Sequence, residues 1–124
     1  ELAVVTVLAA IAAAIAIPAW QTHRLRLHRV DVRVELVALA QHLEECRKSL
    51  SVYDNPICTV APPVMTAAGQ YRIEGKIERD AWQLEAVPVG EQRRDDCGAF
   101  TLDHRGTRGV RGTLPAADCW GPEQ

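Results

Sequence analysis

Residues Leu2–Trp20 read LAVVTVLAAIAAAIAIPAW and follow Glu1, the only charged residue among the first 22. About 20 mostly apolar residues in a helix span the hydrocarbon core of a bilayer, so this run is long enough to cross a membrane. From His23 onward the chain becomes polar and charged. The sequence therefore predicts an apolar half of an N-terminal helix, residues 1–22, which we call the spike. It also predicts a water-soluble part, residues 23–124, which we call the head.

A secretory signal is the first alternative for the spike. Signal peptides place basic residues before a shorter apolar stretch and end in a small-residue cleavage site. Here the basic residues follow the apolar run, as His23, Arg24, Arg26, His28, Arg29 and Arg33. The positive-inside rule would place this cluster in the cytoplasm, whereas cysteines favour an oxidising compartment for the head. We give more weight to the cysteines, because a removed basic leader would set the orientation.

Apolar residues continue at helical spacing beyond the spike, opposite charged residues. They are Leu25, Leu27, Val30, Val34, Leu36, Val37, Leu39, Ala40 and Leu43. We expect one helix from near Glu1 to about Ser49, roughly 70 Å long at 1.5 Å per residue. Pro18 lacks an amide hydrogen and crowds the carbonyl four residues before it. A kink or a loosened turn is therefore expected between Ala14 and Pro18.

The second half of the chain predicts a small antiparallel sheet. Asn55-Pro56, Pro62-Pro63 and Ala67-Ala68-Gly69 indicate a loop over 51–70. Alternating apolar and polar residues then predict strands at Tyr71–Ile77 and Ala81–Val87, a third at Ala99–Asp103 and a short fourth from Thr107 to Arg111. The expected fold class is α+β, with the long helix packed on the sheet, and residues 71–124 hold the sheet and a C-terminal loop.

The four cysteines include no Cys-x-x-Cys pair, so the spacing supports neither a zinc knuckle nor a thioredoxin-like redox pair. Two disulfides are the favoured interpretation. Of the three possible pairings we favour Cys46 with Cys58 and Cys97 with Cys119, because each closes a compact local loop. Four buried, reduced thiols are the alternative.

Enzyme motifs are missing from the sequence. It has no Gly-x-Ser-x-Gly, no His-Glu-x-x-His and no phosphate-binding loop, and Gly106, Gly109 and Gly112 are interpreted as turn residues. His23, His28, His42 and His104 are expected to face solvent. We therefore predict a protein that is not an enzyme and that needs no cofactor or metal. A single-pass enzyme with a membrane anchor is the alternative, and it would require a concave site with perturbed titratable groups.

Five arginines form a candidate nucleic-acid contact. No acidic residue lies among Arg105, Arg108 and Arg111, and Arg93 and Arg94 precede them. Together they would make a basic strip suited to phosphate backbones. Asp95, Asp96 and Asp103 flank the strip, and the net charge is -2. A solvated charged surface is therefore the simpler interpretation.

Two groups of motifs resemble a known family. Glu-Leu-x-Val followed by Ala-Ile-Ala-Ile-Pro resembles the N-terminal signature of type IV pilins. The segments Trp82–Pro88 and Asp96–Asp103 and the closing Cys119-Trp120 resemble PilE-type pilins, often minor ones, of type IVa systems. The resemblance covers most of the chain and leaves Cys46 to Gln70 as its variable part.

This resemblance implies a structural subunit that polymerises into a helical surface filament with its N-terminal helices at the centre. Such filaments serve adhesion, twitching motility or DNA uptake. Before assembly the chain would span the inner membrane once, with its head in the periplasm; afterwards it would be exposed in the extracellular pilus. The implied partners are other pilins and the pilus assembly machinery. Glu1, Leu2 and Pro18 would act in assembly, with Glu1 neutralising the N-terminal amine of a neighbouring subunit.

The sequence departs from the family in two places. Pilins carry a few residues before this glutamate, the first a methylated phenylalanine, so we expect a trimmed start here. They also usually have a glycine in the stretch that Ala9 to Ala12 occupies, so only Pro18 would loosen this helix. Two alternatives within the superfamily are a DNA-binding minor pilin of a competence system and a type II secretion pseudopilin. Ala-Ile-Ala-Ile-Pro and the Cys97 to Cys119 loop disfavour the pseudopilin.

Overall fold

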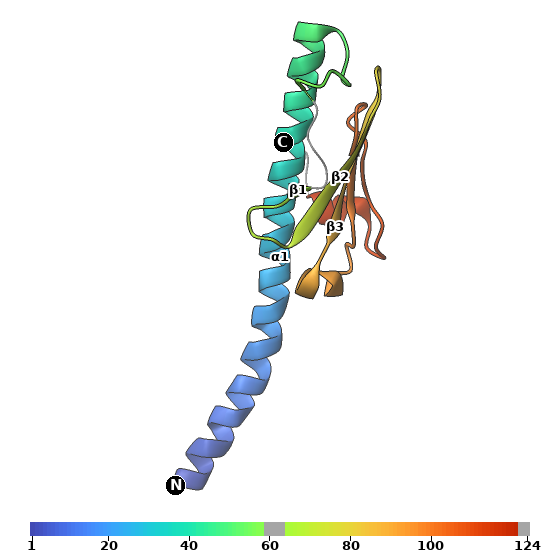
Figure 1. The fold of residues 1–124 in the computed structure, drawn as a ribbon. Coiled ribbons are helices and arrows are strands. Elements are labelled where there is room, and N and C mark those ends of the chain that lie inside the picture. The colour runs from blue at the N-terminus through green and yellow to red at the C-terminus, as the bar shows by residue number, and fades with distance from the viewer. Residues whose placement is uncertain (59–63, 122–124) are drawn as a thin grey trace.

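The computed structural model describes residues 1–58 and 64–121. A long helix carries a small sheet along one side of its C-terminal half, while its N-terminal half projects from the head (Figure 1). The elements in chain order are α1 (Leu2–Leu50), β1 (Val64–Met65), β2 (Tyr71–Ile77), β3 (Trp82–Pro88), the 3-10 helix η1 (Gly90–Arg94), β4 (Phe100–Asp103), β5 (Arg108–Val110) and α2 (Ala116–Trp120).

Helix α1 is continuous through Pro18. The turn before the proline is not broken; instead the helix curves along its N-terminal half (Figure 1). The helix ends where Ser51 adopts a left-handed conformation, with φ of 66°, and its backbone N–H donates to the Arg47 carbonyl at 2.8 Å. This αL residue closes the last turn and points the chain back toward the sheet.

The strands form one antiparallel sheet in the order β1-β2-β3-β4-β5. The observed β2 has the bounds that its alternation predicts. Where an end of β3, β4 or β5 differs from the predicted end, the difference is one residue. Strand β1 lies in the segment predicted as a loop, where Val64 pairs with Ile73. Pro62-Pro63 lies outside the described residues. Gly109 is a strand residue rather than the turn residue that we expected.

The core lies between α1 and one face of the sheet. Val32, Leu36 and Leu43 recur at helical spacing and are fully buried. They face the alternate, inward-pointing residues of the strands, which are Tyr71, Ile73, Trp82, Leu84, Ala86, Phe100 and Leu102. Tyr71, Phe100 and Trp120 pack edge to face and carry the core onto α2. The sheet is thus packed on the part of α1 that follows the spike.

Two disulfides close the ends of this core. Cys46 is bonded to Cys58 and ties the loop after α1 back to the helix, while Cys97 is bonded to Cys119 and ties α2 to the segment before β4. These are the two pairs that the local-loop argument favours. Gly112 packs against the same segment so closely that a Cβ there would lie 2.0 Å from the Asp96 carbonyl oxygen. Only glycine fits at this position.

Candidate functional site

The spike is the largest exposed apolar surface of the described chain. Every residue from Leu2 to Trp20 is exposed, and Leu2 and Ile15 expose 85% and 69% of their surface. This part of α1 is long and apolar enough to cross a membrane. An apolar helix without a partner is unstable in water, so the spike requires lipid or another apolar protein surface around it.

The three predicted assembly residues all lie on this spike. Glu1 precedes the first turn of α1, is exposed and makes no side-chain capping bond. Leu2 begins the helix beside it. Pro18 lies near the other end, where its carbonyl accepts a hydrogen bond from the Thr22 hydroxyl at 3.1 Å. The carboxylate of Glu1 therefore lies at the end of the spike that is farthest from the head, where a group of another molecule can reach it.

The structure spreads the five candidate arginines over both ends of the sheet. Arg93 and Arg94 end η1, which follows Pro88 at the C-terminal end of β3. Arg105 lies in the turn between β4 and β5, beside Trp82 at the N-terminal end of β3. These are opposite ends of the sheet (Figure 1). The five arginines therefore do not lie in one strip, because closeness in sequence is not closeness in space; a solvated charged surface was the simpler interpretation of the sequence.

Within the hairpin, the three arginines differ in environment. Arg111 Nε pairs with Glu85 Oε1 at 2.7 Å, so its charge is already balanced. The Arg108 guanidinium lies over the Trp120 ring, 5.3 Å from its centroid, and remains exposed. Arg105 is exposed in the turn itself. All three arginines are exposed, but Arg111 is paired with Glu85, so Arg105 and Arg108 carry the hairpin's unbalanced charge, and an aromatic ring orders Arg108.

Asp103 fixes the turn that carries Arg105. Its Oδ1 accepts the backbone N–H groups of Arg105 at 2.9 Å and Thr107 at 3.0 Å. Partial burial of Asp103 acts to raise the pKa of its carboxyl, but the hydrogen bonds from Thr107 and Arg105 outweigh it and the pKa is lowered. An ionised Asp103 therefore holds the hairpin tip in shape near neutral pH.

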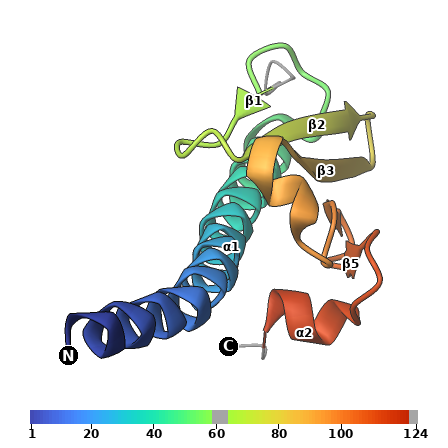
Figure 2. The same ribbon diagram turned by 90° about the horizontal axis from the view of Figure 1, so that it is seen from below.

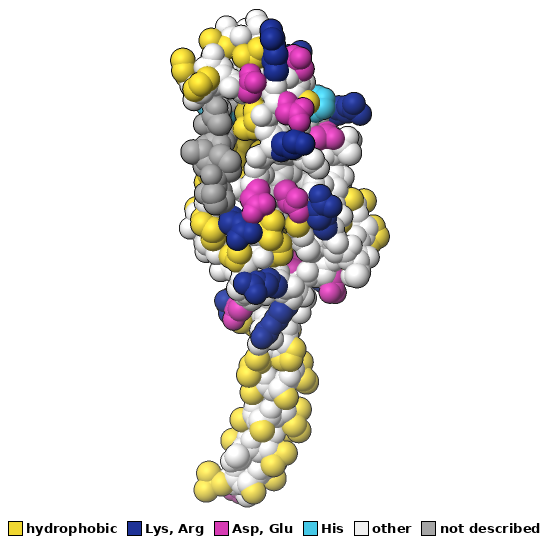
Figure 3. Space-filling view, turned by 45° about the vertical axis from the view of Figure 1, so that its right-hand side comes forward, with side chains coloured by type: hydrophobic (Ala, Val, Ile, Leu, Met, Phe, Trp, Pro, Cys, Tyr) yellow, Lys and Arg dark blue, Asp and Glu magenta, His cyan; other side chains and the backbone are white. Residues whose placement is uncertain are grey.

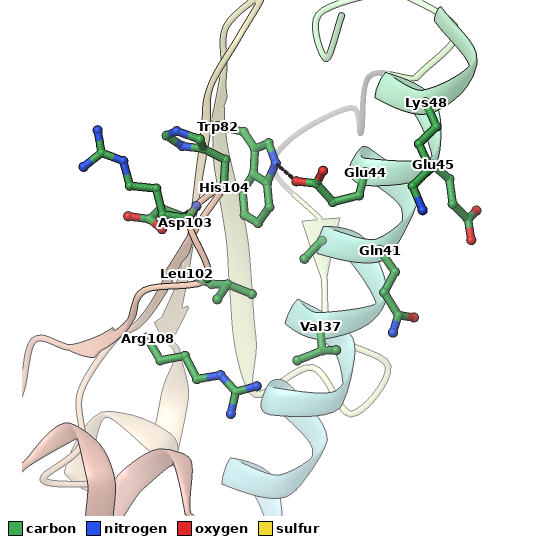
Figure 4. A pocket seen from close by; sticks show the side chains of 13 residues that line it. Val37, Gln41, Glu44, Glu45, Lys48, Trp82, Leu102, Asp103, His104 and Arg108 are labelled. Atoms are coloured by element: carbon green, nitrogen blue, oxygen red, sulfur yellow. Dashed lines mark hydrogen bonds between the residues drawn. The ribbon is translucent and has the colours of Figure 1, made fainter. Parts of the chain in front are cut away.

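A pocket of about 680 Å³ separates this hairpin from α1 (Figure 4). Glu44 Oε1 accepts hydrogen bonds from Trp82 Nε1 at 3.3 Å and from the Tyr53 hydroxyl at 2.9 Å. Burial, and then the bond to Glu44, raise the pKa of Tyr53. Since the Glu44 oxygen is engaged by two donors, it is a structural acceptor rather than a free base. The described residues contain no group of three or more His, Cys, Asp or Glu able to hold a metal.

A polar cluster that the sequence did not predict attaches η1 to α1. Gln92 is fully buried, and its Nε2 donates to the Leu25 carbonyl at 3.0 Å and to the Tyr71 hydroxyl at 2.9 Å. Its Oε1 contacts His28 Nδ1 at 2.9 Å. Asp95 pairs with Arg29 beside it. Burial raises the pKa of Tyr71, so its hydroxyl stays neutral. Nothing in the run Glu91–Asp96 distinguishes Gln92 and Asp95 from their solvated neighbours.

The sequence model of one protein family, described as type IV minor pilin ComP, DNA uptake sequence receptor, matches residues 18–101. The chain belongs to this family. The match covers the end of the spike, the head portion of α1 and the sheet as far as β4. The resemblance to type IV pilins that the N-terminal motif and the cysteine segments indicate is therefore confirmed.

The fold of this type IV pilin agrees with that of a solved relative. A structure described as a high-resolution structure of a type IV pilin from Shewanella oneidensis is 28% identical, covers 79% of this chain and 99% of that chain, and superposes with a TM-score of 0.61. No curated protein matches the chain in sequence. The predicted α+β fold is confirmed, and membership of a pilin family makes the chain a structural subunit of the type IV pilus.

Proposed function

We propose that this minor pilin polymerises through its spike, residues 1–22, with the head, residues 23–124, on the filament surface. Before assembly the spike anchors it in the inner membrane with the head in the periplasm; afterwards the head is extracellular. The observation that carries the proposal is the complete exposure of the apolar spike. In this account the chain has no catalytic role and its partners are other pilins and the assembly machinery.

The apolar surface continues from the spike onto the head. Leu27, Val30 and Val34 lie at helical spacing on α1 and expose 48%, 45% and 63% of their surface. They lie on the side of α1 away from Val32 and Leu36, which are buried against the sheet. A neighbouring helix can therefore pack along α1 beyond the spike, which favours a helical bundle over a simple lipid anchor.

Glu1 supplies a charge for alignment within such a bundle. A carboxylate in lipid or among apolar helices is costly when isolated and tolerated when it is paired. Pairing with the N-terminal amine of a neighbouring subunit would satisfy it. Leu2 would pack beside this pair, and Pro18 would bend the helix where it leaves the bundle.

An aspartate on the spike tests the proposal. Ile11→Asp places a charge on a residue that exposes 54% of its surface, while Ile57→Asp makes the same change on a head residue that exposes 82%. Quantitative mass spectrometry of filaments sheared from cells should show the Ile11 variant depleted at least tenfold and the Ile57 variant retained. Equal recovery of both variants in the filaments would contradict the proposal.

The family description favours DNA binding as a second function. Arg105 and Arg108 are exposed on one hairpin, and the ring of Trp120 orders Arg108. Phosphate contacts release counterions, so binding of duplex DNA by the full chain in detergent should weaken with salt. Arg105→Gln should lower the magnitude of the salt slope by about one. Arg72→Gln, on a residue paired with Glu74, is the matched control. Binding that is absent, or indifferent to salt, would exclude this function.

A further inference from the structure

Four arginines gather where the spike meets the head. Arg24 and Arg26 come from α1, and Arg93 and Arg94 come from η1. The space-filling view shows basic side chains at this junction, directly above the apolar spike (Figure 3). Seen from the spike's end of the molecule, η1 lies in front of the sheet beside α1 (Figure 2). We call these four arginines the basic collar.

The collar lies just beyond the end of the apolar run. Trp20 exposes 60% of its surface at that end, a position typical of an aromatic anchor at a membrane interface. At 1.5 Å per residue, Arg24 and Arg26 follow it by about 6 Å and 9 Å. Gln92, which bonds to the Leu25 carbonyl, holds η1 at the same level. All four arginines therefore lie at headgroup depth when the spike spans a bilayer.

A pocket of about 200 Å³ opens between α1 and η1 within this collar. Its polar lining is rich in hydrogen-bond donors and consists of Gln21, Thr22, Arg24, His28, Glu91 and Arg94. Arg24, Arg94 and the Gln21 amide can donate to the acceptor oxygens of a phosphate group. The Thr22 hydroxyl already donates to the Pro18 carbonyl, and His28 Nδ1 already donates to Gln92 Oε1.

Acidic residues do not cancel the collar. Glu91 pairs with Arg24, at 2.9 Å between Oε2 and Nη2, and lines the same pocket. Asp95 is buried and already paired with Arg29. Asp31 lies on α1 about 16 Å beyond Trp20. Asp96 is exposed two residues after Arg94, and its charge acts on Arg29. The four arginines thus outnumber the two exposed carboxylates beside them, which are those of Glu91 and Asp96.

We propose that the basic collar binds the phosphate headgroups of anionic phospholipids, with one headgroup in the pocket between α1 and η1. The site would orient the head on the bilayer before the chain enters a filament. This inference rests on the proposed membrane anchoring of the spike. We favour lipid over DNA because the spike brings the collar to the bilayer surface.

Tryptophan quenching in lipid nanodiscs tests the inference on the full chain. The discs contain phosphatidylcholine with a minor fraction of phosphatidylglycerol, and either lipid carries bromine in separate samples. Trp20 is exposed at the interface, while Trp82 and Trp120 are buried in the head and give a constant background. The ratio of quenching in the two samples measures the preference for phosphatidylglycerol around Trp20. We expect a clear preference in the native chain.

Two double variants assign that preference to the collar. An arginine near an anionic surface contributes about fivefold to binding, so Arg93→Gln with Arg94→Gln should reduce the preference roughly tenfold or more. Arg79→Gln with Arg105→Gln makes the same charge change at the opposite end of the sheet and should leave it unchanged. An equal effect of both double variants, or no preference in the native chain, would overturn the inference.

Two further outcomes are distinguishable. Should the chain fail to enter the nanodiscs at all, both the anchoring and the collar would be wrong. Should it enter and show no preference for phosphatidylglycerol, only the collar would be wrong. Binding of duplex DNA that is lost in the Arg93→Gln, Arg94→Gln variant, with no lipid preference, would assign the collar to nucleic acid and overturn the proposal.

Discussion

Arg29 on α1 and Asp95, directly after η1, form a two-point ion pair between segments 66 residues apart in sequence. Arg29 Nε lies 2.6 Å from Asp95 Oδ2, and its Nη2 contacts the other carboxylate oxygen. Asp95 exposes 1% of its side chain and Arg29 exposes 18%. The hydrogen bond to Asp95 is the largest cause of the raised pKa of Arg29. This pair fixes the base of the head on α1 and thereby positions the basic collar.

Removing one partner of this pair should destabilise the head strongly. Asp95→Ala leaves a mostly buried guanidinium without its carboxylate, and we expect a loss of about 3 kcal/mol in the free energy of unfolding. Glu91→Ala removes the exposed Arg24 partner and should cost less than about 1 kcal/mol. Guanidinium denaturation of the full chain in detergent, followed by tryptophan fluorescence, measures both. Equal losses of stability in the two variants would contradict the role of the Arg29–Asp95 pair.

Glu44 should matter through the two donors that it satisfies. Glu44→Ala leaves the Tyr53 hydroxyl and Trp82 Nε1 without their acceptor, which should cost about 2 kcal/mol. Glu44→Gln keeps an acceptor oxygen and should recover part of that loss. Glu45→Ala, on the adjacent exposed residue, is the control for the same denaturation experiment. A Gln variant as unstable as the Ala variant would show that the hydrogen bonds are unimportant.

Asp103 predicts one source of acid sensitivity. Its folded pKa lies below the ordinary value of 3.8, so its contribution to stability is full above that value and is lost as pH falls through the folded pKa. Asp103→Asn keeps an acceptor for Arg105 and Thr107 but does not titrate. Its stability should therefore depend less on pH below about 4. Denaturation midpoints between pH 2.5 and 7 measure this, and identical pH profiles would contradict it.

The disulfide between Cys97 and Cys119 should be needed for a stable head. Its loop separation of 22 residues predicts a loss of about 3 kcal/mol when both cysteines are replaced by serine. Cys46→Ser with Cys58→Ser opens a shorter loop, of separation 12, and should cost slightly less. Thermal unfolding of the two double variants compares them. A Cys97→Ser, Cys119→Ser variant as stable as the native chain would contradict this prediction.

Glu1→Val should impair polymerisation while leaving the head folded. The change removes a charge at the tip of the spike, far from both disulfides. We expect a native unfolding midpoint and a severalfold loss of the subunit from sheared filaments. Glu45→Val changes an exposed glutamate of the head and is the control. Normal incorporation of the Glu1 variant would exclude charge pairing as a step in assembly.

The long elements of the fold could be predicted from the sequence because each carries its own periodicity. Seven alternating residues define β2, and the apolar spacing after Trp20 predicts α1 to within one residue of its observed end. Strand β1 has two residues, and η1 and α2 have five each, which is too few to show a period. These short elements form because of tertiary contacts, such as those of the buried Gln92.

The candidate site was only partly predictable for a related reason. Exposure of the spike follows from composition alone, since nothing in the head is large enough to cover it. The placement of the arginines depends on strand register, which puts Arg94 and Arg105 at opposite ends of the sheet. Arg24 and Arg94 lie close together because Gln92 of η1 bonds to the Leu25 carbonyl of α1. A contact between segments so far apart in sequence cannot be predicted from a local pattern.

Photo-crosslinking from the spike tests the central claim most directly. A photoreactive amino acid at Leu8, in the middle of the exposed apolar run, should crosslink to the N-terminal helices of other pilin chains in filaments sheared from the cell surface. The same residue in subunits retained in the membrane should crosslink mainly to lipid. Crosslinks to lipid alone, with no pilin partner in any filament preparation, would contradict assembly through this helix.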